Sequence, residues 1–240
     1  MKQTYVHEIH SRHERRLFVP WVSFVEKRWA IIKTQLTPHN NLLSLAVGAI
    51  SLCCACSAHA GAQREEALSA SVQAVLQRAV SDQATPKLAF SSQQEAQIWL
   101  DEMSQRLAKK IPDAAYRFDL LSTVHYEATR AGLDPHMVLG LIEVESGFRK
   151  YAVSKVGARG FMQVMPFWKK SIGKQDQNLF HMRTNLRYGC TILRHYVDLE
   201  KGDLYRALGR YNGSVGKPEY PNLVKAAWHK HWTRPASLRS

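Results

Sequence analysis

The sequence predicts an all-α protein, and three observations lead to this fold class. Apolar residues recur at three- and four-residue spacing in several segments, as on one face of an α-helix. Residues that open helices, such as Asp113 and Asp134-Pro135, stand directly before two of these segments. No alternation of apolar and polar residues is long enough to indicate a β-strand. Internal repeats and low-complexity segments are absent from the 240 residues.

Residues 1–60 are expected to be a basic N-terminal extension plus a signal peptide, outside the fold. Residues 1–40 carry seven Lys and Arg against three Glu, and an uncharged, mostly apolar run follows over residues 42–56. Ser57-Ala58-His59-Ala60 then has small residues at the two positions that a signal peptidase reads. The run is shorter than the roughly 20 residues of a membrane-spanning helix. The sequence therefore predicts export to the periplasm and no integral membrane anchor in the mature form.

The chain that signal-peptide cleavage would leave has one cysteine and a positive net charge. Cleavage after Ala60 leaves Cys190 as its single cysteine, so no intramolecular disulfide is expected. A lipoprotein is less favoured, because none of Cys53, Cys54 and Cys56 follows the Leu-small-small pattern that lipid attachment prefers. Residues 61–240 hold 26 Lys and Arg against 17 Asp and Glu, a net charge of +9. For an exported protein this favours the anionic cell wall as partner over nucleic acid.

Two helices are expected in a helical N-terminal segment over residues 61–112. Helical spacing covers residues 65–82 and 93–111, with a polar connector around Pro86 between them and a stop at Pro112. Composition leaves open whether this segment packs on the domain that follows or docks a partner.

Capping residues define the next two helices. Asp113 caps a helix that ends at Gly132, and Asp134-Pro135 opens another that ends at Ser146-Gly147. Glu145 therefore lies in a last helical turn, where its carboxylate opposes the helix dipole. Burial would desolvate the carboxylate as well, so both effects are expected to raise its pKa.

The rest of the chain is expected to hold an ordered loop and three helices. Residues 147–166 are glycine-rich and long for a connector, which is typical of functional loops, and their Met and Phe residues favour order. Helical spacing continues over residues 184–201 and 204–211, and a basic helix is expected over residues 220–232.

A motif begins at Glu145 and ends at Pro166. Its parts are Glu145-Ser146-Gly147-Phe148, then Ala152 and Ser154, then Gly157-Ala158-Arg159-Gly160-Phe161-Met162-Gln163, and Pro166. This pattern resembles the lytic transglycosylase family of the soluble type, with a goose-lysozyme-like domain, whose motif reads E-S-x-F, A-x-S and G-A-x-G-L-M-Q. The chain departs from it at Phe161, where Leu is usual. Later matches are Asn178-Leu179-Phe180 and Asn185-Leu186-Arg187-Tyr188-Gly189, both interpreted as structural, and Ala207-Leu208-Gly209-Arg210-Tyr211-Asn212-Gly213.

The resemblance implies a lysozyme-like catalytic domain over residues 113–235 that acts on the glycan strands of peptidoglycan. The eleven histidines show no metal-ligand spacing, and no phosphate loop or zinc pattern occurs, so no cofactor or metal is expected. Glu145 would protonate the glycosidic oxygen between N-acetylmuramic acid and N-acetylglucosamine, then accept the proton of the muramic acid C6 hydroxyl. That hydroxyl closes onto C1, and a 1,6-anhydro end forms. Tyr211 would hydrogen-bond Glu145. The implied substrate-binding residues are Ser154, Gln163, Met165, Tyr211 and Asn212.

Two alternatives remain. A lysozyme-type hydrolase of the same bond would need a second carboxylate to activate water, and Glu143 points roughly 200° away from Glu145 around the helix. A cell-wall-binding assembly protein would keep the groove without turnover. The sequence does not distinguish wall recycling from work beside a secretion or pilus apparatus. Ser146 is expected to bond to the backbone, Cys190 to be buried, and His125, His136, His181 and His195 to be surface or cap residues.

Overall fold

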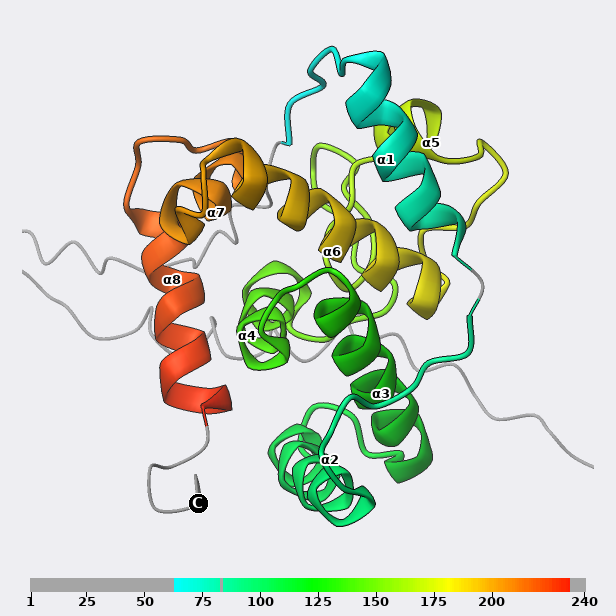
Figure 1. Ribbon diagram of the computed structural model, residues 1–240. Coiled ribbons are helices and arrows are strands. Elements are labelled where there is room, and N and C mark those ends of the chain that lie inside the picture. The colour runs from blue at the N-terminus through cyan, green and yellow to red at the C-terminus, as the bar shows by residue number, and fades with distance from the viewer. Residues whose placement is uncertain (1–62, 83, 234–240) are drawn as a thin grey trace, which may run out of the picture. The chain divides into compact units, whose positions relative to one another are not determined.

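A computed structural model describes residues 63–82 and 84–233 of the chain (Figure 1). The predicted extension and signal peptide over residues 1–60 lie outside the described residues. Within them, the regular structure is helical, and the only β-type pairing consists of the isolated bridges Val153–Arg159 and Arg159–Val164. The all-α prediction is confirmed. No helix of these residues has both the length and the apolar composition needed to cross a membrane.

The helices follow one another along the chain, and the longest connection is the loop over residues 147–166 before α5. Their bounds are α1 (Ala70–Ser81), α2 (Gln93–Leu107), α3 (Ala114–Arg130), α4 (Pro135–Ser146), α5 (Phe167–Ile172), α6 (Met182–Leu199), α7 (Leu204–Asn212), α8 (Glu219–Ala227) and the π-helix η3 (Trp228–Trp232). Helix α1 begins later than predicted because Ser69 caps it, accepting a hydrogen bond from the Val72 amide (3.4 Å). Helix α5 was not predicted, since six residues are too few to show a period.

The predicted caps around α3 and α4 are confirmed. Asp113 accepts a hydrogen bond from the amide of Tyr116 (3.2 Å), and Asp134 accepts one from the amide of His136 (2.6 Å). Gly147 ends α4 in the left-handed conformation, with φ of 58°. These local contacts fix the length of α4 and therefore place Glu145 in its last turn.

Helix α4 lies inside the fold, packed against α3, α8 and η3 (Figure 1). Its apolar side chains, among them Val138, Leu139, Leu141 and Ile142, are fully buried. Gly140 lets α8 approach closely, because a Cβ at this position would lie 2.8 Å from the backbone nitrogen of Trp228. The junction of α8 and η3 is thus pressed directly onto the helix that carries Glu145.

The N-terminal segment packs on the rest of the fold. Helix α1 lies against α5 and α6, and α2 lies against α3. Their buried residues, including Leu76, Trp99 and Met103, belong to the same hydrophobic core as those of the later helices. Of the two alternatives for residues 61–112, packing on the neighbouring helices is therefore observed.

His125 is not at the surface, so its sequence-based interpretation was wrong. Its ring is buried, stacked on Phe90 (4.3 Å between ring centres) and edge-on to Trp99 (5.1 Å). Burial disfavours the charged imidazolium and lowers the pKa of His125 to about 4. The neighbouring helix α2 and the segment before it cover this face of α3, which the spacing of α3 alone could not indicate.

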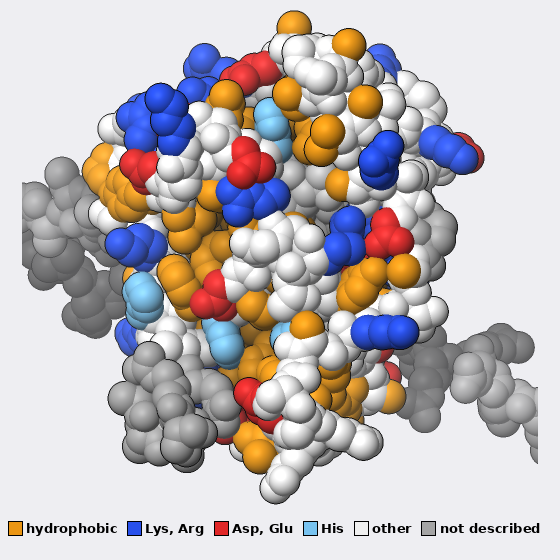
Figure 2. Space-filling model, in the orientation of Figure 1, with side chains coloured by type: hydrophobic (Ala, Val, Ile, Leu, Met, Phe, Trp, Pro, Cys, Tyr) orange, Lys and Arg blue, Asp and Glu red, His pale blue; other side chains and the backbone are white. Residues whose placement is uncertain are grey.

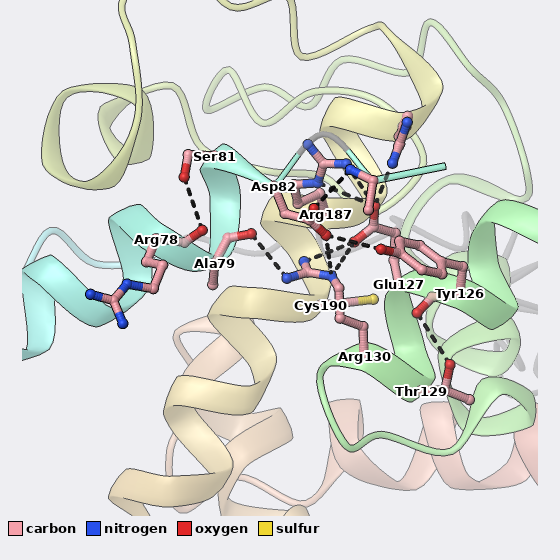
Figure 3. A network of polar contacts seen from close by, with 12 residues as sticks. Arg78, Ala79, Ser81, Asp82, Tyr126, Glu127, Thr129, Arg130, Arg187 and Cys190 are labelled. Carbon is pink, nitrogen blue, oxygen red and sulfur yellow. Dashed lines mark hydrogen bonds and ion pairs between the residues drawn. The ribbon is translucent and has the colours of Figure 1, made fainter. Parts of the chain in front are cut away.

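A buried ionic network joins α1, α3 and α6 (Figure 3). Glu127 of α3 is 0% exposed and accepts hydrogen bonds from the guanidinium groups of Arg130 (2.8 and 3.0 Å) and Arg187 (3.2 Å twice). Arg130 also donates to the carbonyl of Ala79 in α1 (3.0 Å). Asp82, just after α1, accepts a hydrogen bond from the Tyr126 hydroxyl (3.0 Å). The network therefore ties the N-terminal segment to the helices behind the candidate site.

Candidate active site

Glu145 is a buried carboxyl group with one hydrogen-bond partner among the described side chains. The residue is 7% exposed, and its Oε1 accepts a hydrogen bond from the hydroxyl of Tyr220 (2.5 Å). Burial raises the pKa of Glu145 to about 8, and the hydrogen bond from Tyr220 opposes part of that rise. The predicted direction of the shift is confirmed. A carboxyl group of this kind still holds its proton at neutral pH, as a general acid must.

Tyr220, and not Tyr211, donates the hydrogen bond to Glu145, so the sequence-based assignment was wrong. The Tyr211 hydroxyl donates instead to the carbonyl of Met162 (2.7 Å). The reason is the close contact of α8 with α4, which brings Tyr220, in the first turn of α8, over the carboxyl group. Burial raises the pKa of both tyrosines well above the usual value, so both are hydroxyl donors. The sequence around Tyr220 indicates a helix start but not what that helix faces.

Glu143 contacts other residues than Glu145 does, as its position in the helix predicted. It accepts a hydrogen bond from the indole of Trp232 (2.8 Å), lies 3.0 Å from His231 Nδ1, and pairs with Lys110 (3.3 Å). Burial alone would raise the pKa of Glu143, but the hydrogen bonds from His231 and Trp232 lower it overall. Glu143 is thus a fixed carboxylate that secures η3, and it does not share a face with Glu145.

The loop over residues 147–166 is held by hydrogen bonds from α4 on one side and α6 on the other. The Ser146 hydroxyl donates to the carbonyl of Phe161 (2.8 Å) and to that of Ile142 (3.2 Å), which confirms the expected bond to the backbone. Asn185 of α6 fixes the other side, accepting from the Met162 amide (2.8 Å) and donating to the Arg159 carbonyl (2.8 Å). The structural interpretation of the Asn185 motif is confirmed.

In the structure, the predicted substrate-binding residues form hydrogen bonds and packing contacts within the loop over residues 147–166 and around α7. The Ser154 hydroxyl accepts a hydrogen bond from the Ala158 amide (3.0 Å). The Gln163 side-chain amide is buried and donates to the carbonyls of Gly160 (2.9 Å) and Ala152 (3.2 Å).

Met165 and Asn212 complete this set. Met165 is half-buried and packs against the core. Asn212 Nδ2 donates to the Ser214 hydroxyl (3.1 Å), whereas Asn212 Oδ1 is buried with no hydrogen-bond partner among the described residues. Contacts of these residues with sugar stay predictions. Among the predicted substrate-binding residues, Asn212 is the one whose side chain has a buried acceptor without a hydrogen-bond partner in the described part of the chain.

Gln63 supports the site from outside the motif. Its buried side chain accepts hydrogen bonds from the Trp168 indole (2.9 Å) and the Met165 amide (3.3 Å), and donates to the Gln163 carbonyl (3.5 Å). Gln63 lies 100 to 105 residues before these partners in the chain. No signal in the sequence around Gln63 could have revealed this contact, because it exists only after α1 packs on α5 and α6.

The comparisons with known proteins agree with this arrangement. Residues 122–222, which include Glu145, Tyr211 and Tyr220, match the family model described as Transglycosylase SLT domain. This stretch of the chain is similar to that domain family. No solved structure matches the chain.

Two curated transglycosylases are similar to this chain over part of their length. The transglycosylase of Enterobacteria phage PRD1 is 33% identical over 104 residues, which is 43% of this chain and 38% of the relative. The membrane-bound lytic murein transglycosylase C of Glaesserella parasuis is 38% identical over 112 residues, 40% of this chain and 31% of the relative. The chain thus spans about a third of the length of these two relatives.

Proposed function

We propose that this protein is a peptidoglycan lytic transglycosylase. It cleaves the β-1,4 bond between N-acetylmuramic acid and N-acetylglucosamine and leaves a 1,6-anhydromuramic acid end. The observation that carries this proposal is Glu145, a buried carboxyl group with a pKa raised to about 8, within a transglycosylase SLT domain. Residues 113–235 form the proposed catalytic domain, and residues 61–112 form the helical segment that precedes it.

Glu145 acts first as an acid and then as a base. Its protonated carboxyl gives the proton to the glycosidic oxygen, and the bond from that oxygen to C1 breaks. The resulting carboxylate takes the proton of the C6 hydroxyl while O6 bonds to C1, so the acid is restored and no water is consumed. The Tyr220 hydroxyl, 2.5 Å from Oε1, stabilises the carboxylate between the two steps. An internal hydroxyl held near C1 has a high effective concentration.

The position of Glu143, the nearest carboxylate to Glu145 in the sequence, supports this reaction over hydrolysis. An inverting or retaining hydrolase of the usual kind needs a partner carboxylate facing the acid. Glu143 is held by Trp232 and Lys110 on another face of α4. The hydrolase therefore remains the second candidate, and a cell-wall-binding assembly protein the third.

Product masses test the proposal. Purified protein digests isolated peptidoglycan, and the soluble muropeptides are weighed by mass spectrometry. We expect anhydro-muropeptides, which are lighter than the hydrolysed products by one water. Products with reducing ends would show a hydrolase instead, and sacculus binding without any soluble product would favour the assembly protein.

The pH profile provides a second test, because the acid must carry its proton. The rate constant kcat/KM is expected to fall as the pH rises through about 8. Tyr220→Phe removes the hydrogen bond that favours the carboxylate, so the pKa rises and the falling limb moves to higher pH by about one unit. Tyr205→Phe is the control, since the Tyr205 hydroxyl bonds to Asn222 on the surface. A limb that stays in place in Tyr220→Phe would contradict this role.

The proposed place of action is the periplasm. The relative from Glaesserella parasuis is named as membrane-bound, and the predicted signal peptide and net positive charge of residues 61–240 suit an exported protein that meets the anionic wall. A secretion or pilus apparatus as partner stays a prediction from the sequence.

A further inference from the structure

The positive charge of the chain is concentrated directly after Glu145. Residues 146–175 carry seven Lys and Arg and no Asp or Glu. The other 150 residues of the 61–240 segment hold 19 basic against 17 acidic residues, so the 30-residue stretch carries most of the net charge of +9. By contrast with this stretch, the face drawn in Figure 2 has acidic side chains close to basic ones. The seven cations are Arg149, Lys150, Lys155, Arg159, Lys169, Lys170 and Lys174.

Four of these cations lie in residues 149–159, which we call the cationic loop. None of the four forms an ion pair with a carboxylate among the described residues. Lys150 lies over the ring of Tyr151 (5.2 Å) and Arg159 over that of Phe180 (5.8 Å), so their charges face aromatic rings instead of acids. Elsewhere the pattern differs, since Arg194 pairs with Asp198. The cationic loop therefore presents uncompensated positive charge.

The same loop exposes large apolar side chains. Tyr151 is 71% exposed, Val153 61% and Val156 51%. Large apolar residues grouped on a surface mark contact sites, and cations between them select an anionic partner. The hydrogen bonds of Gly160 and Gln163 to the Ala152 carbonyl (2.9 and 3.2 Å) hold the loop in one shape.

The cationic loop lies beside the proposed acid. Arg149 Nε donates to the carbonyl of Ser146 (2.9 Å), the residue after Glu145, at the end of α4. The cationic loop therefore starts next to the helical turn that carries Glu145, where the proposed function places the scissile bond. The peptide arms of peptidoglycan branch from muramic acid and carry carboxylates. A four-residue arm extends up to about 14 Å, enough to reach from the scissile bond to a neighbouring loop.

We propose that the cationic loop binds these carboxylate-bearing peptide arms, so that the enzyme prefers glycan strands that carry peptides. The inference rests on the proposed function and adds the form of the substrate. The cations meet the carboxylates of the arm, and the exposed Tyr151, Val153 and Val156 side chains meet its apolar groups.

The test compares two double variants that remove the same charge. Lys150→Gln with Lys155→Gln neutralises the cationic loop, whereas Lys170→Gln with Lys174→Gln removes two charges from the same stretch outside the loop. Glycan strands are used with their peptides intact or stripped by an amidase. For peptide-bearing strands we expect the loop variant to lose about threefold to tenfold in kcat/KM, and the control variant to stay near the wild type. Both variants should match the wild type on stripped strands.

Each other outcome has a definite meaning. Equal kcat/KM of the wild type on intact and stripped strands would overturn the inference while leaving the transglycosylase proposal in place. An equal loss in both double variants would show a general charge effect and would also overturn it. Binding to vesicles of anionic phospholipid that only the loop variant loses, without any strand preference, would assign the loop to a membrane surface. No anhydro product from either strand would count against the proposed function itself.

Discussion

Replacing Glu145 with Gln is expected to reduce the formation of anhydro-muropeptides by about a thousandfold, while sacculus binding is retained. Gln has nearly the shape of Glu and can still accept the Tyr220 hydrogen bond, but its amide cannot protonate the glycosidic oxygen. The measurement is the rate of anhydro-muropeptide release by mass spectrometry, beside sacculus binding by sedimentation. Full activity in this variant would remove Glu145 from the mechanism.

Two controls separate lost chemistry from lost structure. Glu143→Gln changes the other carboxylate of the same turn and should keep most activity, since Glu143 only secures η3. Stability provides the second control. The pKa of Glu145 is raised to about 8 in the folded state, so its favourable contribution is complete below the unfolded value near 4.5 and is lost as the pH rises through about 8. Gln does not titrate, so Glu145→Gln does not lose stability in this way, and its melting temperature at pH 9 should be higher than that of the wild type.

The parts of the site that the sequence predicted depend on local rules. The cap at Asp134 and the left-handed Gly147 define α4, and those two signals place Glu145 in its last turn. A pKa raised by burial follows once that turn faces the interior. Such features involve residues within one or two turns of each other, which is why spacing and residue type sufficed.

The parts that escaped prediction depend on how distant helices pack. Tyr220 reaches Glu145 across 75 residues of sequence because Gly140 admits the backbone of Trp228. Gln63 reaches the loop before α5 only because α1 packs there. Tyr211 had the expected sequence position, but its hydroxyl points at Met162. Hydrogen bonds of this kind are set by interhelical distances of a few ångströms, and no periodic pattern encodes them.

Replacing Glu127 with Ala is expected to lower the free energy of unfolding by about 3–5 kcal/mol. The change removes the carboxylate that accepts hydrogen bonds from Arg130 and Arg187, and Arg187 is itself 5% exposed in its side chain. A buried guanidinium would be left without its partner, and α3 and α6 would lose the ionic contact between Glu127 and Arg187 (Figure 3). Urea unfolding followed by circular dichroism gives the midpoint and the slope.

The surface pair of Arg194 and Asp198 provides the matched control for this loss. Asp198 is 66% exposed in its side chain, so Asp198→Ala should cost less than about 1 kcal/mol. Because the penalty in Glu127→Ala comes from the unpaired Arg187, adding Arg187→Met should recover part of the lost stability by removing the second charge. If Glu127→Ala cost no more than Asp198→Ala, the buried network would contribute no more than an exposed ion pair. If the double variant were less stable than Glu127→Ala by the full cost of losing Arg187, the two residues would act independently.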